Sequence, residues 1–142
     1  MKVLIPVDGS DCSMRAIDFV VRKMRPSCGE RLDIKLLTVH PPIPYPRAVA
    51  VIGHEKAQEY YEEEGNAALQ PARARLDRDK IPYQAQIRVG EPGETIARYA
   101  SEVGVDQIVM GTHGRGSVGR LLMGSVATKV VQLAEVPVLL VK

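Results

Sequence analysis

Glycines, arginines and serines that could hold phosphate gather between residues 111 and 125. They follow the apolar run Ile108-Val109-Met110, which predicts a buried strand, and they end at Gly124-Ser125, which predicts a helix start. Glycines let a backbone approach a ligand closely, and the free N–H groups of a helix start attract anions. Arg115 and Arg120 add positive charge. The pattern favours a phosphate-binding loop over a flexible turn with an N-capping serine.

Two familiar nucleotide-binding motifs overlap this stretch, and neither fits its setting. Gly114 to Gly119 fits the dinucleotide pattern G-x-G-x-x-G, but a single predicted strand follows it, which leaves no second half-fold for a nicotinamide. Gly119 to Ser125 resembles a P-loop that lacks its lysine and has no strand directly before it. Both interpretations are therefore rejected.

Apolar runs alternate with helical patterns along the chain, which predicts an α/β fold with a parallel sheet and helices on both faces. Strands are expected at residues 3–7, 31–39, 83–89, 105–111 and 136–141. Helices are expected from the N-cap Ser10 to Pro26, and at 54–79, 96–103 and 124–133. Pro71 should kink or divide the second helix, and Pro137 marks the last strand as an edge.

The proline-rich segment His40–Gly53 is expected to be irregular. A connection of this length in a compact domain is typical of a lid, a binding loop or a mobile segment. A merely solvated loop remains the alternative, since the apolar stretch Ala48–Ile52 alone argues for contact with something.

Three predicted strand ends carry candidates for ligand contacts. They are Pro6-Val7-Asp8-Gly9-Ser10, Thr38-Val39-His40 and Met110-Gly111-Thr112-His113-Gly114. In open parallel sheets ligands bind beyond the carboxyl ends of the strands, so we expect these segments to form one site. Asp8 is expected to contact the ligand, with a turn-forming role or a Mg²⁺ contact as alternatives.

Composition limits the class of protein. The chain has 142 residues, 45% of them hydrophobic, which suits one globular domain with a sizeable core. A net charge of +2 without a basic run argues against nucleic acid as a partner. We expect a cytoplasmic protein, because Cys12 and Cys28 have no CxxC spacing and no signal peptide or membrane-spanning run is evident.

A longer spacing across the glycine stretch is more specific than the short motifs. Gly111-x2-Gly114-x9-Gly124-Ser125 resembles the G-2x-G-9x-G-[ST] motif of the ATP-binding branch of the universal stress protein family. The likeness extends to the opening at 3–10, the turn at 89–92, the segment at 106–115 and the closing residues 136–142. It implies a five-stranded sheet in the order 3-2-1-4-5, and a homodimer through Val136–Val141. The unprotected edge independently suggests the same dimer.

The resemblance also implies a role for each position that matches the family motif. Pro6, Val7 and Asp8 would line the adenosine pocket, and Val39 would pack against the base. Met110 and Gly111 would border the ribose. The phosphates of ATP would lie on the remaining positions: Gly114, Arg115, Gly124, Ser125 and Val126. His113 would cap the loop or touch a phosphate, and Ala127 replaces a threonine found in some members.

The function predicted from these residues is regulatory: bound ATP would tune dimer or partner contacts, with slow hydrolysis at most. No residue is assigned a catalytic role, because no nucleophile–base pair or water-orienting group has a recognisable spacing. Two alternatives stay open. One is a nucleotide-independent module that binds an unknown protein through residues 40–53 and the edge strand, and the other is a slow ATPase or autophosphorylating enzyme.

Overall fold

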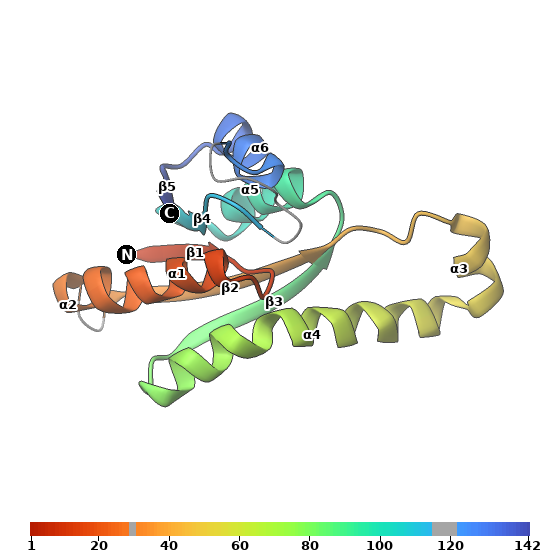
Figure 1. Ribbon diagram of the computed structural model, residues 1–142, viewed down its shortest axis with the longest axis horizontal. Helices are drawn as coiled ribbons and strands as arrows, with labels where there is room; N and C mark the ends of the chain where they lie inside the picture. Colours follow the sequence, from red (N-terminus) through yellow and green to blue (C-terminus); the bar gives the residue numbers. More distant parts are fainter. Residues whose placement is uncertain (29–30, 115–121) are drawn as a thin grey trace.

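The computed structural model describes residues 1–28, 31–114 and 122–142. Its sheet has five strands, all parallel, in the order β3-β2-β1-β4-β5 (Figure 1). The strands are β1 (Lys2–Pro6), β2 (Asp33–His40), β3 (Tyr83–Val89), β4 (Gln107–Gly111) and β5 (Val138–Val141). The predicted fold class and strand order are confirmed, and β5 is an edge strand as Pro137 indicated.

Helices cover both faces of the sheet. They are α1 (Asp11–Phe19), the π-helical η1 (Val20–Met24), α2 (Arg25–Cys28), α3 (Pro46–Ile52), α4 (His54–Arg78), α5 (Pro92–Val103) and α6 (Ser125–Leu133). On one face α1 and α4 pack over β1 and β2, around fully buried Ile5, Ile34 and Leu69. On the other face α5 and α6 pack around Leu4 and Ile108. The continuously apolar strands therefore bury both of their faces.

Hydrogen bonds by side chains fix where two helices begin. Ser10 caps α1, since its hydroxyl accepts the backbone N–H of Ser13 at 3.2 Å. Glu91 caps α5, since its carboxylate accepts the N–H groups of Gly93 at 3.1 Å and Glu94 at 2.6 Å. Both caps follow strand ends directly, so each helix starts beside the carboxyl edge of the sheet.

Prolines affect the helices less than their pattern indicated. The first helix continues through Pro26 as α2, after a π turn in which the Arg25 N–H donates to Val20 O. This wider turn comes where a regular helix would press the proline ring against a carbonyl. Pro71 does not divide α4, which runs unbroken for 25 residues because Leu69, Ala72 and Leu76 pack against the sheet.

The segment after β2 is less irregular than expected. Residues 46–52 form α3, with Pro46 at a position in the first turn where its missing N–H costs no hydrogen bond. Together with the first turns of α4, α3 projects beyond the body of the sheet (Figure 1). The sequence analysis missed this helix because three other prolines precede it closely.

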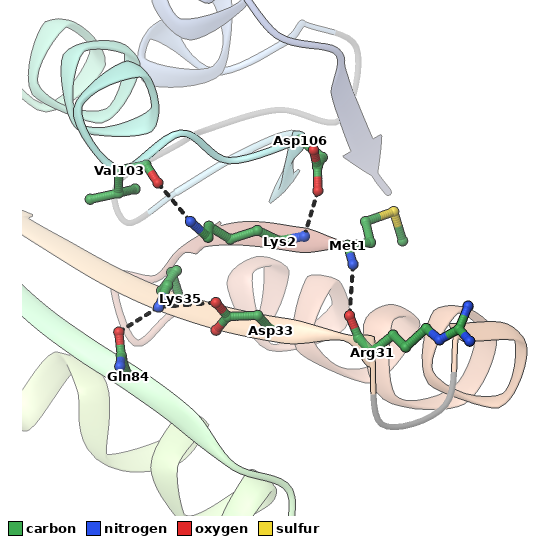
Figure 2. A network of polar contacts seen from close by, with 8 residues as sticks. All are labelled: Met1, Lys2, Arg31, Asp33, Lys35, Gln84, Val103 and Asp106. Carbon is green, nitrogen blue, oxygen red and sulfur yellow. Dashed lines mark hydrogen bonds and ion pairs between the residues drawn. The ribbon is translucent and has the colours of Figure 1, made fainter.

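A polar network ties the amino ends of the strands to their neighbours (Figure 2). The backbone N–H of Lys2 donates to Asp106 Oδ2 at 2.6 Å, and its ammonium donates to Val103 O at 3.0 Å. Lys35 bridges Asp33 and Gln84 on the other side of β1. These bonds fix the relative register of β1, β4, β2 and β3 at the edge that faces away from the predicted site.

None of the helices in the described ranges combines the length and the apolar character needed to cross a membrane.

An ion-pair triad joins α4 to α1 and gives a pH prediction. Arg75 donates to Asp18 at 2.8 Å and to Asp79, and its hydrogen bond holds the pKa of Asp79 below the usual 3.8. A carboxylate whose pKa is lower in the folded state stabilises the protein above its unfolded pKa. This contribution disappears as the pH falls through the folded pKa.

We therefore expect Arg75→Gln to flatten the dependence of unfolding free energy on pH below about pH 4. Urea denaturation between pH 3 and pH 7 measures it. Arg78→Gln is the matched control, because the Arg78 guanidinium is 70% exposed, lies 3.5 Å from Asp79 and lowers the pKa of Asp79 less than Arg75 does. This variant should lose a smaller part of the pH dependence. Equal acid sensitivity in parent and Arg75→Gln would contradict the assignment.

Candidate functional site

A pocket of about 400 Å³ opens at the carboxyl ends of β1, β2 and β4, where the sheet reverses its order of connection. Such a position is where open parallel sheets bind ligands. Predicted site residues in its lining are Pro6, Val7, Asp8, Val39, Met110, Gly111, His113, Gly114, Gly124, Ser125 and Val126. Arg115 lies outside the described residues. The three strand ends therefore converge as the sequence analysis expected.

Asp8 lies where the first strand passes into α1. Its Oδ1 accepts the backbone N–H of Ser10 at 2.9 Å, so the turn-forming role is present. A Cβ added to Gly114 would lie 2.6 Å from Asp8 Oδ2. The carboxylate therefore lies directly against the backbone of Gly114, an approach that a larger residue would prevent. Asp8 thus joins the first strand end to the glycine segment that follows β4.

Gly111, the last residue of β4, has an equally close neighbour. A Cβ at this position would lie 2.8 Å from the carbonyl carbon and oxygen of Cys12, and 2.7 Å from its Sγ. Glycine is thus required for the first turn of α1 to pack against the end of β4. This contact holds the two walls of the pocket together.

The start of α6 presents backbone donors toward the pocket. Gly124 is the N-cap, and its own N–H donates to Thr112 O at 2.7 Å, which joins the helix start to the end of β4. Within the described residues no side chain caps this helix. Since Thr128 N–H makes the first intrahelical bond, to Gly124 O, the preceding N–H groups of Ser125, Val126 and Ala127 favour an anion.

His113 bridges the two ends of the glycine stretch. Its Nδ1 lies 2.9 Å from Thr112 Oγ1, and its Nε2 forms a hydrogen bond with Leu122 O. A carbonyl oxygen only accepts, so Nε2 carries the proton, and in the neutral ring Nδ1 accepts the hydroxyl proton of Thr112. The predicted capping role of His113 is therefore present, while a phosphate contact stays a prediction.

The rest of the lining is mainly apolar and includes residues that the sequence analysis did not place in the site. These are Ser13, Leu37, Pro41, Pro92, Ile96 and Ala127. Pro92 and Ile96 reach the pocket because α5 begins directly after the Glu91 cap, a signal that the sequence carries in Glu91-Pro92. An apolar slot thus adjoins a polar end made of Asp8, the glycines and the start of α6.

Metal-ligating side chains do not cluster within the described part of the chain. No group of three or more His, Cys, Asp or Glu residues there is arranged to hold an ion. A divalent cation at this pocket would therefore need ligand oxygens, such as those of a phosphate chain, in addition to Asp8.

Comparison with known proteins assigns the chain to a family. The model of the universal stress protein family matches residues 1–142. The chain belongs to the universal stress protein family. The universal stress protein MJ0531 of Methanocaldococcus jannaschii is 33% identical over 141 residues, which are 99% of this chain and 81% of that protein.

Solved structures of family members share the fold. The universal stress protein UspA from Lactobacillus plantarum superposes with a TM-score of 0.80 at 25% identity, over 100% of this chain and 97% of that one. A universal stress protein in complex with cAMP superposes with a TM-score of 0.67 at 26% identity, over 100% of this chain and 97% of that one.

The contact between Gly111 and Cys12 gives a stability prediction for this universal stress protein. Gly111→Ala should reduce the free energy of unfolding by about 1–3 kcal/mol, because the new methyl group collides with packed backbone. Cys12→Ala should not rescue it, since the Cys12 carbonyl group remains 2.8 Å away when the thiol is removed. Urea denaturation of the two single variants and the double variant measures both effects. Full rescue would show that only the Cys12 thiol collides with a side chain at position 111.

Proposed function

We propose that this universal stress protein binds an adenine nucleotide, ATP with Mg²⁺, in the pocket at the carboxyl ends of β1, β2 and β4. The observation that carries the proposal is the division of this pocket into an apolar slot and an anion-favouring end. A nucleotide has the same division, with a flat apolar base at one end and phosphates at the other. The volume of about 400 Å³ lies in the range of small-molecule sites.

The base and the ribose belong in the apolar slot. Val39 of β2 and Ile96 of α5 both line it, so a planar ring can pack against aliphatic side chains. Asp8 lies at the boundary with the polar end, where its carboxylate can accept a hydrogen bond from a nucleoside hydroxyl or amino group. Met110 and Gly111 then border the ribose.

The phosphates belong at the start of α6. Ser125 and Val126 offer backbone N–H groups there, and Gly114 and Gly124 line the pocket beside them. Arg115 is assigned to the same phosphates by its position in the family motif. The complex of a related universal stress protein with cAMP supports an adenine nucleotide as the ligand class.

The nucleotide is assigned a regulatory role in the cytoplasm, as a signal in a stress response, with slow hydrolysis at most. Asp8 and His113 are the ionisable side chains among the described lining residues. Both already have structural tasks, since Asp8 accepts the N–H of Ser10 and His113 bridges Thr112 and Leu122. Fast hydrolysis needs a residue that positions the attacking water, and neither side chain is free for that task.

The binding prediction targets the first residue of α6. Ser125→Glu places a negative charge where the phosphates are expected, and should weaken ATP binding by about 100-fold or more through repulsion. The helix itself should not suffer, because an acidic side chain is favourable in a first turn. Isothermal titration calorimetry with Mg-ATP measures the affinity, and the thermal midpoint reports the fold.

Gln132→Glu is the matched control for this variant. It adds the same charge to the other end of α6, at an exposed position, and should bind ATP like the parent. Equal affinity of Ser125→Glu and the parent would overturn the site assignment. A parent that shows no affinity for Mg-ATP, and releases no nucleotide on denaturation, would favour the nucleotide-independent interaction module instead.

Dimerisation through β5 belongs to the same proposal. Leu139 of β5 is 37% exposed, and Val131 and Leu133 at the end of α6 are 46% and 45% exposed. An edge strand beside such an apolar surface is suited to pair with a second copy. Since Val141 O accepts the N–H of Thr112 at 3.2 Å, this edge is bonded directly to a pocket residue.

We expect Leu139→Glu to lower the average mass in sedimentation velocity, because the charge would be buried without a partner in the paired edge. Arg22→Glu is the control for a general effect of added negative charge, since Arg22 is exposed on η1 and belongs to neither edge strand. An unchanged mass distribution of Leu139→Glu would contradict association through β5.

A further inference from the structure

The sheet has a second open edge, formed by β3. All seven of its residues pair with β2 on one side, and no strand among the described residues lies on the other. α4 does not cover this edge, because Leu69 and Leu76 join a cluster that includes Ile34 and Leu36 of β2, so the helix lies over the face of the sheet. Gln84, Gln86 and Arg88 are exposed.

One hydrogen bond identifies the main-chain groups of β3 that face outward. Gly90 N–H donates to His40 O at 3.0 Å, so the even-numbered residues of β3 direct their N–H and C=O groups toward β2. The odd-numbered residues then direct theirs outward. These are Tyr83, Ala85, Ile87 and Val89.

The odd-numbered and even-numbered side chains of β3 lie on opposite faces of the sheet. Tyr83, Ala85 and Ile87 pack into the core cluster under α4. On the other face Gln84 contacts Lys35, and the Arg88 guanidinium lies 5.3 Å from the centre of the Tyr99 ring of α5. The α4 face of the edge is therefore apolar and the α5 face is polar.

We infer that the β3 edge is a self-complementary surface, which pairs antiparallel with β3 of a second copy about a two-fold axis at Gln86. In this register every outward-facing residue meets an outward-facing residue, since Tyr83 lies opposite Val89 and Ala85 opposite Ile87. Antiparallel pairs of this kind exchange both main-chain hydrogen bonds. Pro82, which lacks an N–H, precedes the paired residues and removes none of these bonds.

The side chains agree with the same register. On the α4 face aliphatic and aromatic groups meet, and Val89, 40% exposed in the single chain, is covered by Tyr83 of the second copy. On the α5 face Gln84 meets Arg88, and Gln86 meets its own copy, so two amides can pair. No like charges face each other, whereas an axis at Arg88 would oppose two arginines.

Charge along α4 is complementary under this axis. The first half of the helix holds all five of its glutamates beside Lys56, and the second half holds its three arginines beside Asp77. The glutamates are Glu55, Glu59, Glu62, Glu63 and Glu64, and the arginines are Arg73, Arg75 and Arg78. Gly65 packs against Ile87, so Glu62 and Arg73 lie on opposite sides of the strand midpoint. Both line a groove of about 360 Å³ between α4 and β3, where the axis brings Glu62 of the second copy toward Arg73.

Cysteine cross-linking in a Cys28→Ser background tests the axis directly. Gln86→Cys puts the two introduced thiols in a non-hydrogen-bonded pair, where Cβ atoms lie about 4.5–5.5 Å apart, close to disulfide geometry. Under mild oxidation the cross-linked dimer should form about tenfold or more faster than with Gln84→Cys. Position 84 is equally exposed and on the same strand, but the axis separates its two copies by about 13 Å.

A mixture of Gln84→Cys and Arg88→Cys should cross-link between the two variants, because these positions lie opposite each other in the proposed register. The test is independent of β5, which lies at the other edge of the sheet. Equal rates at positions 84 and 86, or no cross-link at position 86, would overturn the proposal. A faster cross-link of Gln84→Cys with itself would show a different register and would overturn it as well.

Discussion

The parallel direction of all five strands is the constraint on which the rest of this molecule depends. It forces helices onto both faces of the sheet and buries the strands between two apolar clusters. It also gathers every carboxyl end at one edge, where α1, α5 and α6 begin with their N–H groups. Backbone N–H groups that can bind a ligand therefore gather at the carboxyl ends of the strands, and the pocket lies there. At the amino ends of the strands the polar groups make structural bonds instead, such as that of Lys2 with Asp106.

Backbone and small residues build most of the polar end of this pocket. Gly111 and Gly114 bring the end of β4 against Cys12 and Asp8, and Gly124 joins the start of α6 to Thr112. A site of this kind offers fixed N–H donors, which hold an anion well. Hydrolysis of a phosphate ester also requires a side chain that can orient water or transfer a proton. Asp8 and His113, the ionisable side chains among the described lining residues, are both held by hydrogen bonds.

Local signals in the sequence predicted the fold class and the position of the pocket, whereas the strand order followed from the family resemblance. Continuous apolar runs identify buried parallel strands, and the glycine spacing from Gly111 to Gly124 identifies the loop that follows the fourth. Sequence patterns did not predict the features that depend on tertiary packing. Pro71 stays inside an intact helix because Leu69 and Leu76 are fully buried. The position of Ile96 in the lining depends on the direction of α5 across the sheet, which no local pattern contains.

The segment after β2 connects the pocket to the projecting helices. Pro41 lines the pocket, and two residues further on the Ile43 N–H donates to the Tyr61 hydroxyl at 2.8 Å. The His40 ring lies 5.4 Å from the rings of both Tyr60 and Tyr61. Side chains of α4 therefore contact both ends of the segment from His40 to Ile43. At the far tip Val51 is 85% exposed. Pro41 thus begins a chain of packed contacts that leads from the pocket to α4.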